Sequence, residues 1–241
     1  MDVGLIIIGN EILSGATEDT NSTFIARSLF EMGADLKEIV TLPDIVPLVA
    51  SKVKEFSERF ELVVTTGGIG PTHDDITYEA VAQGLGVGLH LEPHFEALVK
   101  SRFKERMNEA SLKLARIPEG STWLDPGAFW FPPVVARNVV IFPGVPMLLE
   151  GQFSTIAQLL PRACHFVRSV RVFYSEFLLA DLAEGVDARY PDVEVGSYPY
   201  LAGTERHVTL KFTGKNQESV ESAFKEFLAG IPPEARYELL D

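Results

Sequence analysis

The chain has 241 residues, enough for one large domain or for a medium and a small one. Its formal net charge of −13 argues against DNA, RNA and anionic membranes as partners, because these polyanions would be repelled at long range. The single cysteine, Cys164, excludes an intrachain disulfide and a cysteine-based metal cluster, and we expect a partly buried thiol. No basic leader is visible and no apolar run reaches the roughly 18–20 residues of a membrane span, which favours a cytoplasmic protein.

Apolar strand-like segments alternate with amphipathic segments through the first two thirds of the chain. We expect strands at 5–8, 37–42, 62–66 and 139–142, and helices at 20–33, 45–56, 76–85 and 92–107. Asp44 is the expected N-cap of the second helix, with Ile45, Leu48, Val49, Val53 and Phe56 on its apolar face. Strands with short all-apolar stretches and helices between them predict a mainly parallel sheet covered on both faces, hence a three-layer α/β/α sandwich over residues 1–163.

The pattern changes twice after the third helix. The segment 123–133 combines two tryptophans, two phenylalanines and three prolines, which predicts a rigid irregular loop or a hairpin. From Cys164 onward the order reads β-α-β-β-α, with strands at 169–174, 193–198 and 207–212 and helices at 175–190 and 217–228. A small C-terminal α+β domain is therefore expected over residues 164–241.

A glycine-rich turn between the strand at 62–66 and the next helix is the most informative segment. It contains Thr66, Gly67, Gly68 and Gly70, followed by His73, Asp74 and Asp75. Such a turn leaves backbone N–H groups free to bind an anion at the helix N-terminus, and these glycines are spaced more densely than a turn requires. Two carboxylates beside an anion site make sense if a divalent cation lies between them and a phosphate. The alternative is a tight turn in which one aspartate caps the helix.

Further polar residues follow the first and last strands of the sandwich. Asn10, Glu11, Asp19 and Asn21 come after the first strand, and Gly144 lies in the turn 142–146 after the last. Ligands of such sheets bind beyond the carboxyl ends of the strands, so these residues are expected on the same rim as the glycine turn. Asp19 could instead cap a helix, Glu11 could simply face water, and Gly144 could belong to an ordinary strand-to-helix turn.

Three segments resemble a known family. Residues 9–13 with 19–21, residues 65–77 and residues 142–146 are similar to the molybdopterin-binding (MoaB/Mog-like) superfamily, in the branch shared by CinA proteins and the N-terminal domain of eukaryotic FAD synthases. The stretch 125–134 departs from the Asn-Pro-x-Gly-x-Ala-Pro-Gly pattern of CinA proteins and is closer to the FAD-synthase version, as is 196–199. No nicotinamide-mononucleotide deamidase or FAD-forming adenylyltransferase domain is recognisable, so neither activity is expected.

The resemblance implies metal-dependent hydrolysis of a dinucleotide diphosphate, FAD or ADP-ribose, that releases AMP. In this interpretation Asp74, Asp75, Glu11 and Asp19 hold a divalent cation, Mg²⁺ or Co²⁺, with a monovalent cation as a second ion. His73 acts as acid or base, or is only salt-bridged to an aspartate. Phosphate contacts come from Gly67, Gly68, Gly70 and Gly144, with Thr66, Asn10 and Asn21. The alternatives are a pterin- or nucleotide-binding or adenylyl-transferring protein of molybdenum-cofactor assembly, and a regulatory remnant. The resemblance also implies a homo-oligomer.

Overall fold

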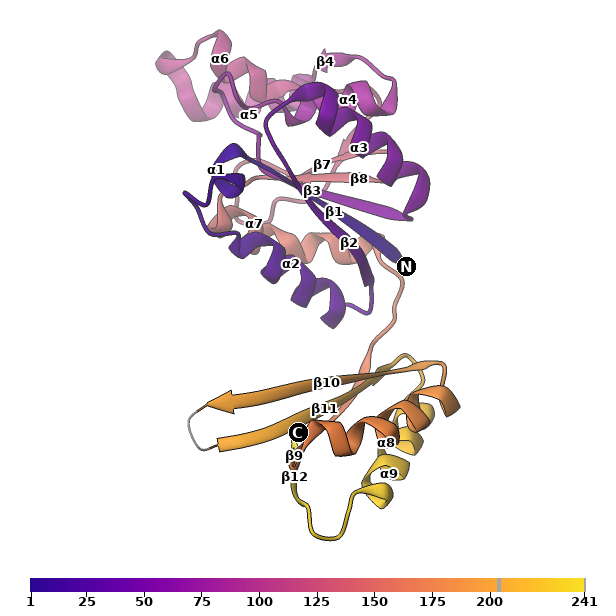
Figure 1. The fold of residues 1–241 in the computed structure, drawn as a ribbon. Helices are drawn as coiled ribbons and strands as arrows, with labels where there is room; N and C mark the ends of the chain where they lie inside the picture. The colour runs from indigo at the N-terminus through magenta and orange to yellow at the C-terminus, as the bar shows by residue number, and fades with distance from the viewer. Residues whose placement is uncertain (203–204, 241) are drawn as a thin grey trace. The chain divides into compact units, whose positions relative to one another are not determined.

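The computed structural model describes residues 1–202 and 205–240. The chain folds into two compact units, residues 1–162 and residues 163–241 (Figure 1). This division lies one residue from the expected domain boundary. Among the described residues, no helix has the length and apolar character needed to cross a bilayer.

The N-terminal unit is built on a six-stranded sheet with the order β2-β1-β3-β8-β7-β6. Four strands are parallel: β1 (Asp2–Ile8), β2 (Asp35–Leu42), β3 (Leu62–Thr66) and β8 (Val139–Phe142). The last two, β7 (Val134–Ala136) and β6 (Thr122–Trp123), are antiparallel. Because β6 and β7 pair with each other, the irregular segment between them is the connecting loop of a hairpin, so both expected descriptions apply.

Helices cover both faces of this sheet, which confirms the three-layer sandwich (Figure 1). One face packs against α2 (Thr20–Glu31) and α7 (Pro146–Phe153), and the other against α3 (Val46–Arg59) and α4 (Thr77–Leu85). Strand β3 is buried along its whole length because both of its faces are covered. The remaining elements of this unit are α1 (Asn10–Leu13), β4 (Leu89–Leu91), α5 (Pro93–Phe103), η1 (Lys104–Arg106), α6 (Glu109–Leu112), η2 (Lys113–Ala115), β5 (Arg116–Pro118) and η3 (Ser154–Leu159).

The C-terminal unit is an antiparallel sheet with the order β10-β11-β9-β12, packed against two helices. Its elements are β9 (Phe166–Phe173), α8 (Glu176–Arg189), β10 (Val193–Ala202), β11 (Glu205–Gly214), α9 (Gln217–Gly230) and β12 (Arg236–Leu240). The expected β-α-β-β-α order is present, and β12 is an additional strand at the sheet edge. The sequence pattern missed β12 because its residues are mostly exposed and do not alternate between a buried and an open face.

Several local expectations were wrong. Asp44 does not cap α3; its carboxylate instead accepts a hydrogen bond from the backbone N–H of Asn10. Ile45 precedes α3, and Pro47 in the first turn removes one N–H that a cap would have accepted from. Ile45 and Leu48 are about half exposed, so the buried face begins at Val49.

Two further corrections concern the expected helix 92–107 and the cysteine. The helix ends at Phe103, and η1 follows it, because Lys104 has a positive φ of 49° that an α-helix does not accommodate. The thiol of Cys164 is exposed rather than partly buried.

Candidate functional site

The carboxyl ends of the three central parallel strands meet in a crowded junction. Gly67, at the end of β3, has a φ of +100°, and a side chain there would collide with the carbonyl oxygen of Ile8 at the end of β1. A Cβ on Gly144, after β8, would lie 3.0 Å from the Cα of Gly67. The sequence therefore places glycine where three backbones approach one another, and the expected common rim of Gly67 and Gly144 is present.

Asn21 ties the first turn of α2 to this junction. Its side-chain N–H groups donate to Thr66 Oγ1 at 3.2 Å and to the carbonyl oxygen of Gly144 at 2.9 Å, and Thr66 Oγ1 donates to the carbonyl of Pro143 at 2.8 Å. Asn21 is 9% exposed, yet its Oδ1 has no hydrogen-bond partner among the described residues. A buried carbonyl oxygen left unpaired is costly, so this atom is suited to a ligand that donates a hydrogen bond or to a cation.

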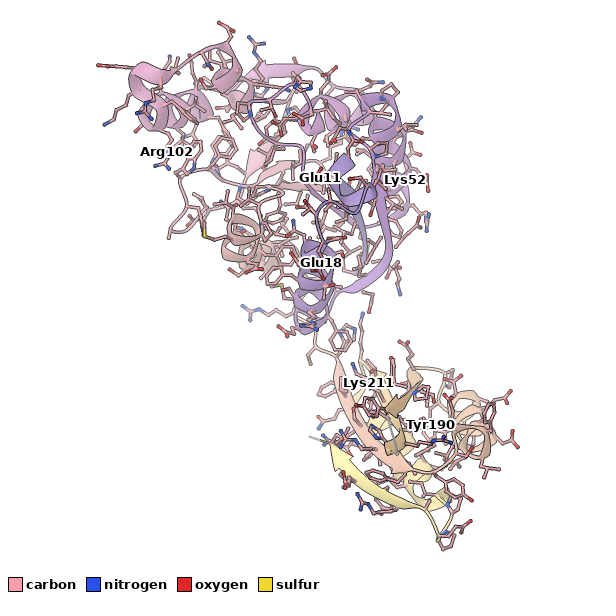
Figure 2. All side chains as sticks on the ribbon, turned by 60° about the vertical axis from the view of Figure 1, so that its left-hand side comes forward. Glu11, Glu18, Lys52, Arg102, Tyr190 and Lys211 are labelled. Atoms are coloured by element: carbon pink, nitrogen blue, oxygen red, sulfur yellow. The ribbon has the colours of Figure 1, made fainter. Side chains whose placement is uncertain are left out.

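A small cavity of about 60 Å³ lies on the α1 and α2 side of the glycine turn. Its lining includes Glu11, Asp19 and Asn21 together with Gly67 and Gly144. Glu11, labelled in Figure 2, lies in α1. Asp19 is also the N-cap of α2, where its carboxylate accepts from the N–H of Ser22 at 2.9 Å. The capping alternative for Asp19 is thus present, and the same side chain still lines the cavity.

The remainder of the turn is held by two side chains. Thr77, the first residue of α4, donates from its hydroxyl to the carbonyl of Gly67 at 2.8 Å and from its N–H to that of Gly68 at 3.0 Å. Asp75 Oδ2 accepts from the N–H and the hydroxyl of Thr72, at 2.8 and 2.5 Å. Ile76, which has no capping side chain, occupies the N-cap position of α4. Neither aspartate caps this helix, so the capping alternative for the turn does not hold.

A larger cavity of about 390 Å³ lies on the other side of the turn. Gly68, Gly70 and Asp75 line it, and so do Lys113, Arg116, Tyr78, Glu79 and Glu109. Lys113 Nζ donates to the carbonyl of Thr72 at 2.6 Å, which brings one positive charge against the glycine turn. The junction therefore has a small acidic cavity on one side and a larger cavity of mixed charge on the other.

Tyr78 is the least expected member of the larger cavity. Its side chain is 7% exposed, and its hydroxyl has no hydrogen-bond partner among the described residues. Burial raises the pKa of Tyr78 well above its ordinary value, because the phenolate would be poorly solvated. The group is therefore a neutral hydroxyl, able to donate a hydrogen bond to a ligand in the cavity.

Three of the predicted site residues line neither cavity. Asn10 is exposed, and its backbone N–H is bonded to Asp44. Asp74 has a side chain 58% exposed and His73 one 99% exposed, with Nδ1 of the histidine 3.9 Å from the aspartate Oδ1. The side chain of Thr72, and after it the backbone N–H of Asp74, lower the pKa of the Asp74 carboxyl. Both residues lie on the outer part of the turn.

The four carboxylates expected to share one cation are thus divided by the turn. Glu11 and Asp19 line the small cavity, Asp75 lines the large one, and Asp74 lines neither. Within residues 1–202 and 205–240, no group of three or more His, Cys, Asp and Glu side chains is close enough to ligate one metal ion. A metal here would need other oxygens, and the unpaired Asn21 Oδ1 is one such oxygen.

Sequence reasoning missed Tyr78, Glu79, Lys113 and Arg116. Tyr78 and Glu79 follow the recognised turn directly, so proximity along the chain is a signal that could have identified them. Lys113 and Arg116 are about 40 residues further on, in a segment without a motif, and only the tertiary fold brings them to the turn.

In a comparison with known protein families, each of the two units matches one family model. Residues 4–162 match the family described as "Probable molybdopterin binding domain", and residues 165–239 match the one described as "FAD synthase, middle domain". A protein of Archaeoglobus fulgidus is 36% identical over 230 residues, which cover 94% of this chain and 96% of that protein. A protein of Caenorhabditis briggsae named "Probable FAD synthase" is 31% identical over 94% of this chain, but the match spans only 49% of that protein.

This chain is also similar to a solved structure, the protein CinA with unknown function from Thermoplasma acidophilum. It has a TM-score of 0.61 and 29% identity, over 66% of this chain and 98% of that one. The chain therefore belongs to the probable molybdopterin-binding domain family, in the branch that also contains CinA proteins and FAD synthases.

Proposed function

We propose that this chain is a metal-dependent hydrolase of a dinucleotide diphosphate, with FAD as the preferred substrate and ADP-ribose as the other. Addition of water to one phosphorus breaks the bridging P–O bond. FAD then gives AMP and riboflavin monophosphate, and ADP-ribose gives AMP and ribose 5-phosphate. The observation that carries the proposal is the glycine turn flanked by an acidic cavity and a cavity that contains cationic side chains.

In this proposal the small cavity receives the cation. Glu11 and Asp19 supply carboxylates and Asn21 supplies its unpaired Oδ1, a set of hard oxygen donors that suits Mg²⁺ and tolerates Co²⁺. At about 60 Å³ the cavity has room for an ion with bound water, since about 10–15 Å³ of such space already holds one water. A divalent cation there would lie beside the glycine turn, where it would offset the negative charge of a diphosphate bound to the same turn and lower the pKa of a bound water.

The larger cavity would receive the diphosphate. Backbone N–H groups of the glycine turn and the first turn of α4 offer hydrogen bonds to phosphate oxygens, and Lys113 and Arg116 offer positive charge. Tyr78 would donate its hydroxyl proton as a hydrogen bond to a phosphate oxygen. Asp75 accepts both hydrogen bonds from Thr72 through Oδ2, which leaves Oδ1 to accept from the attacking water. The preference for FAD is supported by the similarity of both units to FAD synthases.

Product analysis tests the proposal directly. The chain is incubated with FAD or ADP-ribose under a panel of divalent metals, and release of AMP is followed by chromatography. Glu11→Gln and Asp19→Asn should each raise the metal concentration needed for half-maximal rate, with partial recovery at high metal. Asn still caps a helix, so the second variant removes the charge and keeps α2 intact. Glu31→Gln, at the far end of α2, is the matched control.

A metal requirement that is the same in Glu11→Gln, Asp19→Asn and Glu31→Gln would exclude the small cavity as the cation site. No AMP from either dinucleotide with any metal would overturn hydrolysis itself.

A second candidate, adenylyl transfer or the holding of a pterin or nucleotide, is favoured by the match of residues 4–162 to the molybdopterin-binding family. The same turn and cavities would serve it. Incubation with ATP and a pterin monophosphate separates the two functions. Transfer releases inorganic pyrophosphate only when the acceptor is present, whereas hydrolysis releases AMP from a dinucleotide without any acceptor.

A further inference from the structure

A third cavity, of about 210 Å³, adjoins the glycine turn in the N-terminal unit. It shares Ile69 and Gly70 with the larger polar cavity, so the turn forms part of the lining of both. The remainder of its lining is almost entirely apolar and includes Phe103, Leu114, Phe129, Trp130, Phe131 and Leu148. Its volume is below the roughly 300–1,000 Å³ of sites that enclose a whole drug-sized ligand, so it fits one ring system rather than a dinucleotide.

The aromatic part of this lining is held in place by its neighbours. The guanidinium carbon of Arg102, labelled in Figure 2, lies 5.8 Å from the centre of the Trp130 ring, within the usual range of a cation–π contact. Phe103 makes a T-shaped contact with the same indole and Phe131 a tilted one, with ring centres 6.0 and 5.0 Å away. A flat apolar ligand would therefore meet a wall that is already ordered, which limits the entropy lost on binding.

Polar groups are scarce in this cavity. Among the residues that line it, only Gln152 and the indole of Trp130 have polar side-chain atoms. Gln152 is 2% exposed, and its amide N–H already donates to the carbonyl of Phe131 at 2.5 Å. A ring whose edges carry several donors and acceptors would leave them unpaired here, at roughly a 5- to 150-fold loss of affinity for each.

We infer that this aromatic cavity takes the isoalloxazine ring of a flavin, entering by its dimethylbenzene edge. The inference rests on the proposed function, because the shared glycine turn would hold the diphosphate while the ring lies beside it. Adenine and pterin rings carry hydrogen-bonding groups on their edges, whereas the dimethylbenzene edge of a flavin carries none. Beyond its diphosphate, ADP-ribose carries only a polar ribose and has no second aromatic ring to fill the cavity. The cavity thus selects FAD over ADP-ribose.

Flavin fluorescence tests the inference without any hydrolysis. An indole in contact with an isoalloxazine ring quenches its emission, and phenylalanine does not. The chain has two tryptophans, Trp130 in the cavity and Trp123 outside its lining. Riboflavin, which has no phosphate, and FAD should both be quenched on titration with the protein. Most of this quenching should be lost in Trp130→Phe and kept in Trp123→Phe.

A second pair of variants fills the cavity instead of changing its quencher. Leu148→Phe adds bulk to the lining, and Met147→Phe makes a similar change at a neighbouring residue that is 71% exposed and outside the lining. Leu148→Phe should weaken riboflavin binding by about tenfold or more, because loss of one stacked ring is worth roughly 5- to 150-fold. Thermal melts of both variants show whether the fold is kept.

The possible outcomes separate this inference from the proposed function. Trp130-dependent quenching without AMP release supports the ring site and overturns hydrolysis. AMP release from FAD without Trp130-dependent quenching of either probe overturns the ring site and leaves hydrolysis standing. Equal effects of Leu148→Phe and Met147→Phe on riboflavin affinity, with both folds intact, also overturn it.

Discussion

The hydroxyl of Tyr78 offers a sharp test of the larger cavity, because its removal should have opposite effects on stability and on turnover. In the free protein this hydroxyl is buried and unpaired among the described residues. An unpaired buried polar group costs about 1–3 kcal/mol. For Tyr78 we take the lower end of this range. Tyr78→Phe should therefore leave the melting temperature unchanged or raise it by about 2–4 °C, the shift that 1 kcal/mol produces in a chain of this size.

Turnover should change in the other direction. A hydrogen bond to a charged group is worth about 1.5–3 kcal/mol, so loss of one to a phosphate lowers kcat/KM by roughly 10- to 150-fold. Because the pKa of Tyr78 is raised by burial, this loss should not vary across neutral and mildly alkaline pH. AMP release and scanning calorimetry of the same preparations measure both quantities.

Tyr190→Phe is the matched control for this experiment. Tyr190, labelled in Figure 2, lies in the C-terminal unit, and its hydroxyl donates to Glu226 at 3.0 Å. Its loss should lower stability and leave kcat/KM unchanged. If Tyr78→Phe behaves in the same way, with a lower melting temperature and normal turnover, the hydroxyl has a structural partner and the assigned role is wrong.

Three other predictions follow from the turn and its surroundings. Asp75→Asn should lower kcat/KM by at least about tenfold and Asp74→Asn by less, since Asp75 lines the larger cavity and Asp74 lines neither cavity beside the turn. Equal losses at saturating metal would instead make Asp74 a ligand. Gly67→Ala should abolish soluble expression or lower the melting temperature severely, because the added methyl meets the carbonyl of Ile8; a normal melt would contradict this crowding. The side chain of His90 lowers the pKa of Glu92 in the folded protein. The carboxylate therefore stabilises the fold at pH values above its unfolded pKa of about 4.5, and this contribution is lost as the pH falls through the lower pKa of the folded state. Glu92→Gln should therefore reduce the difference in melting temperature between pH 6 and pH 3, and an unchanged difference would refute the linkage.

The sequence was sufficient to predict the glycine turn and the strands around it. Gly67 and Gly68 adopt positive φ. Glycine is the residue type that permits this conformation, so the turn could be predicted without tertiary information. Apart from Asp2, the residues of β1, β3 and β8 are buried because both faces of the sheet are covered, and the apolar stretches in these strands already indicated a buried parallel sheet. Parallel strands also place their carboxyl ends on one edge, which brought Asn21 and Gly144 to the turn as expected.

The division of the site into separate cavities was decided by tertiary structure. Chain order places Glu11, Asp19, Asp74 and Asp75 on one rim, but the side of the turn on which each lies depends on how α1, α2 and α4 pack. Lys113 reaches the turn only because the chain returns there after α6, and a lysine in an unpatterned segment carries no signal of that return. Periodicity and turn chemistry depend on neighbouring residues and can therefore be recognised in the sequence. A cavity is formed by segments distant along the chain, and their approach depends on the packing of the whole unit.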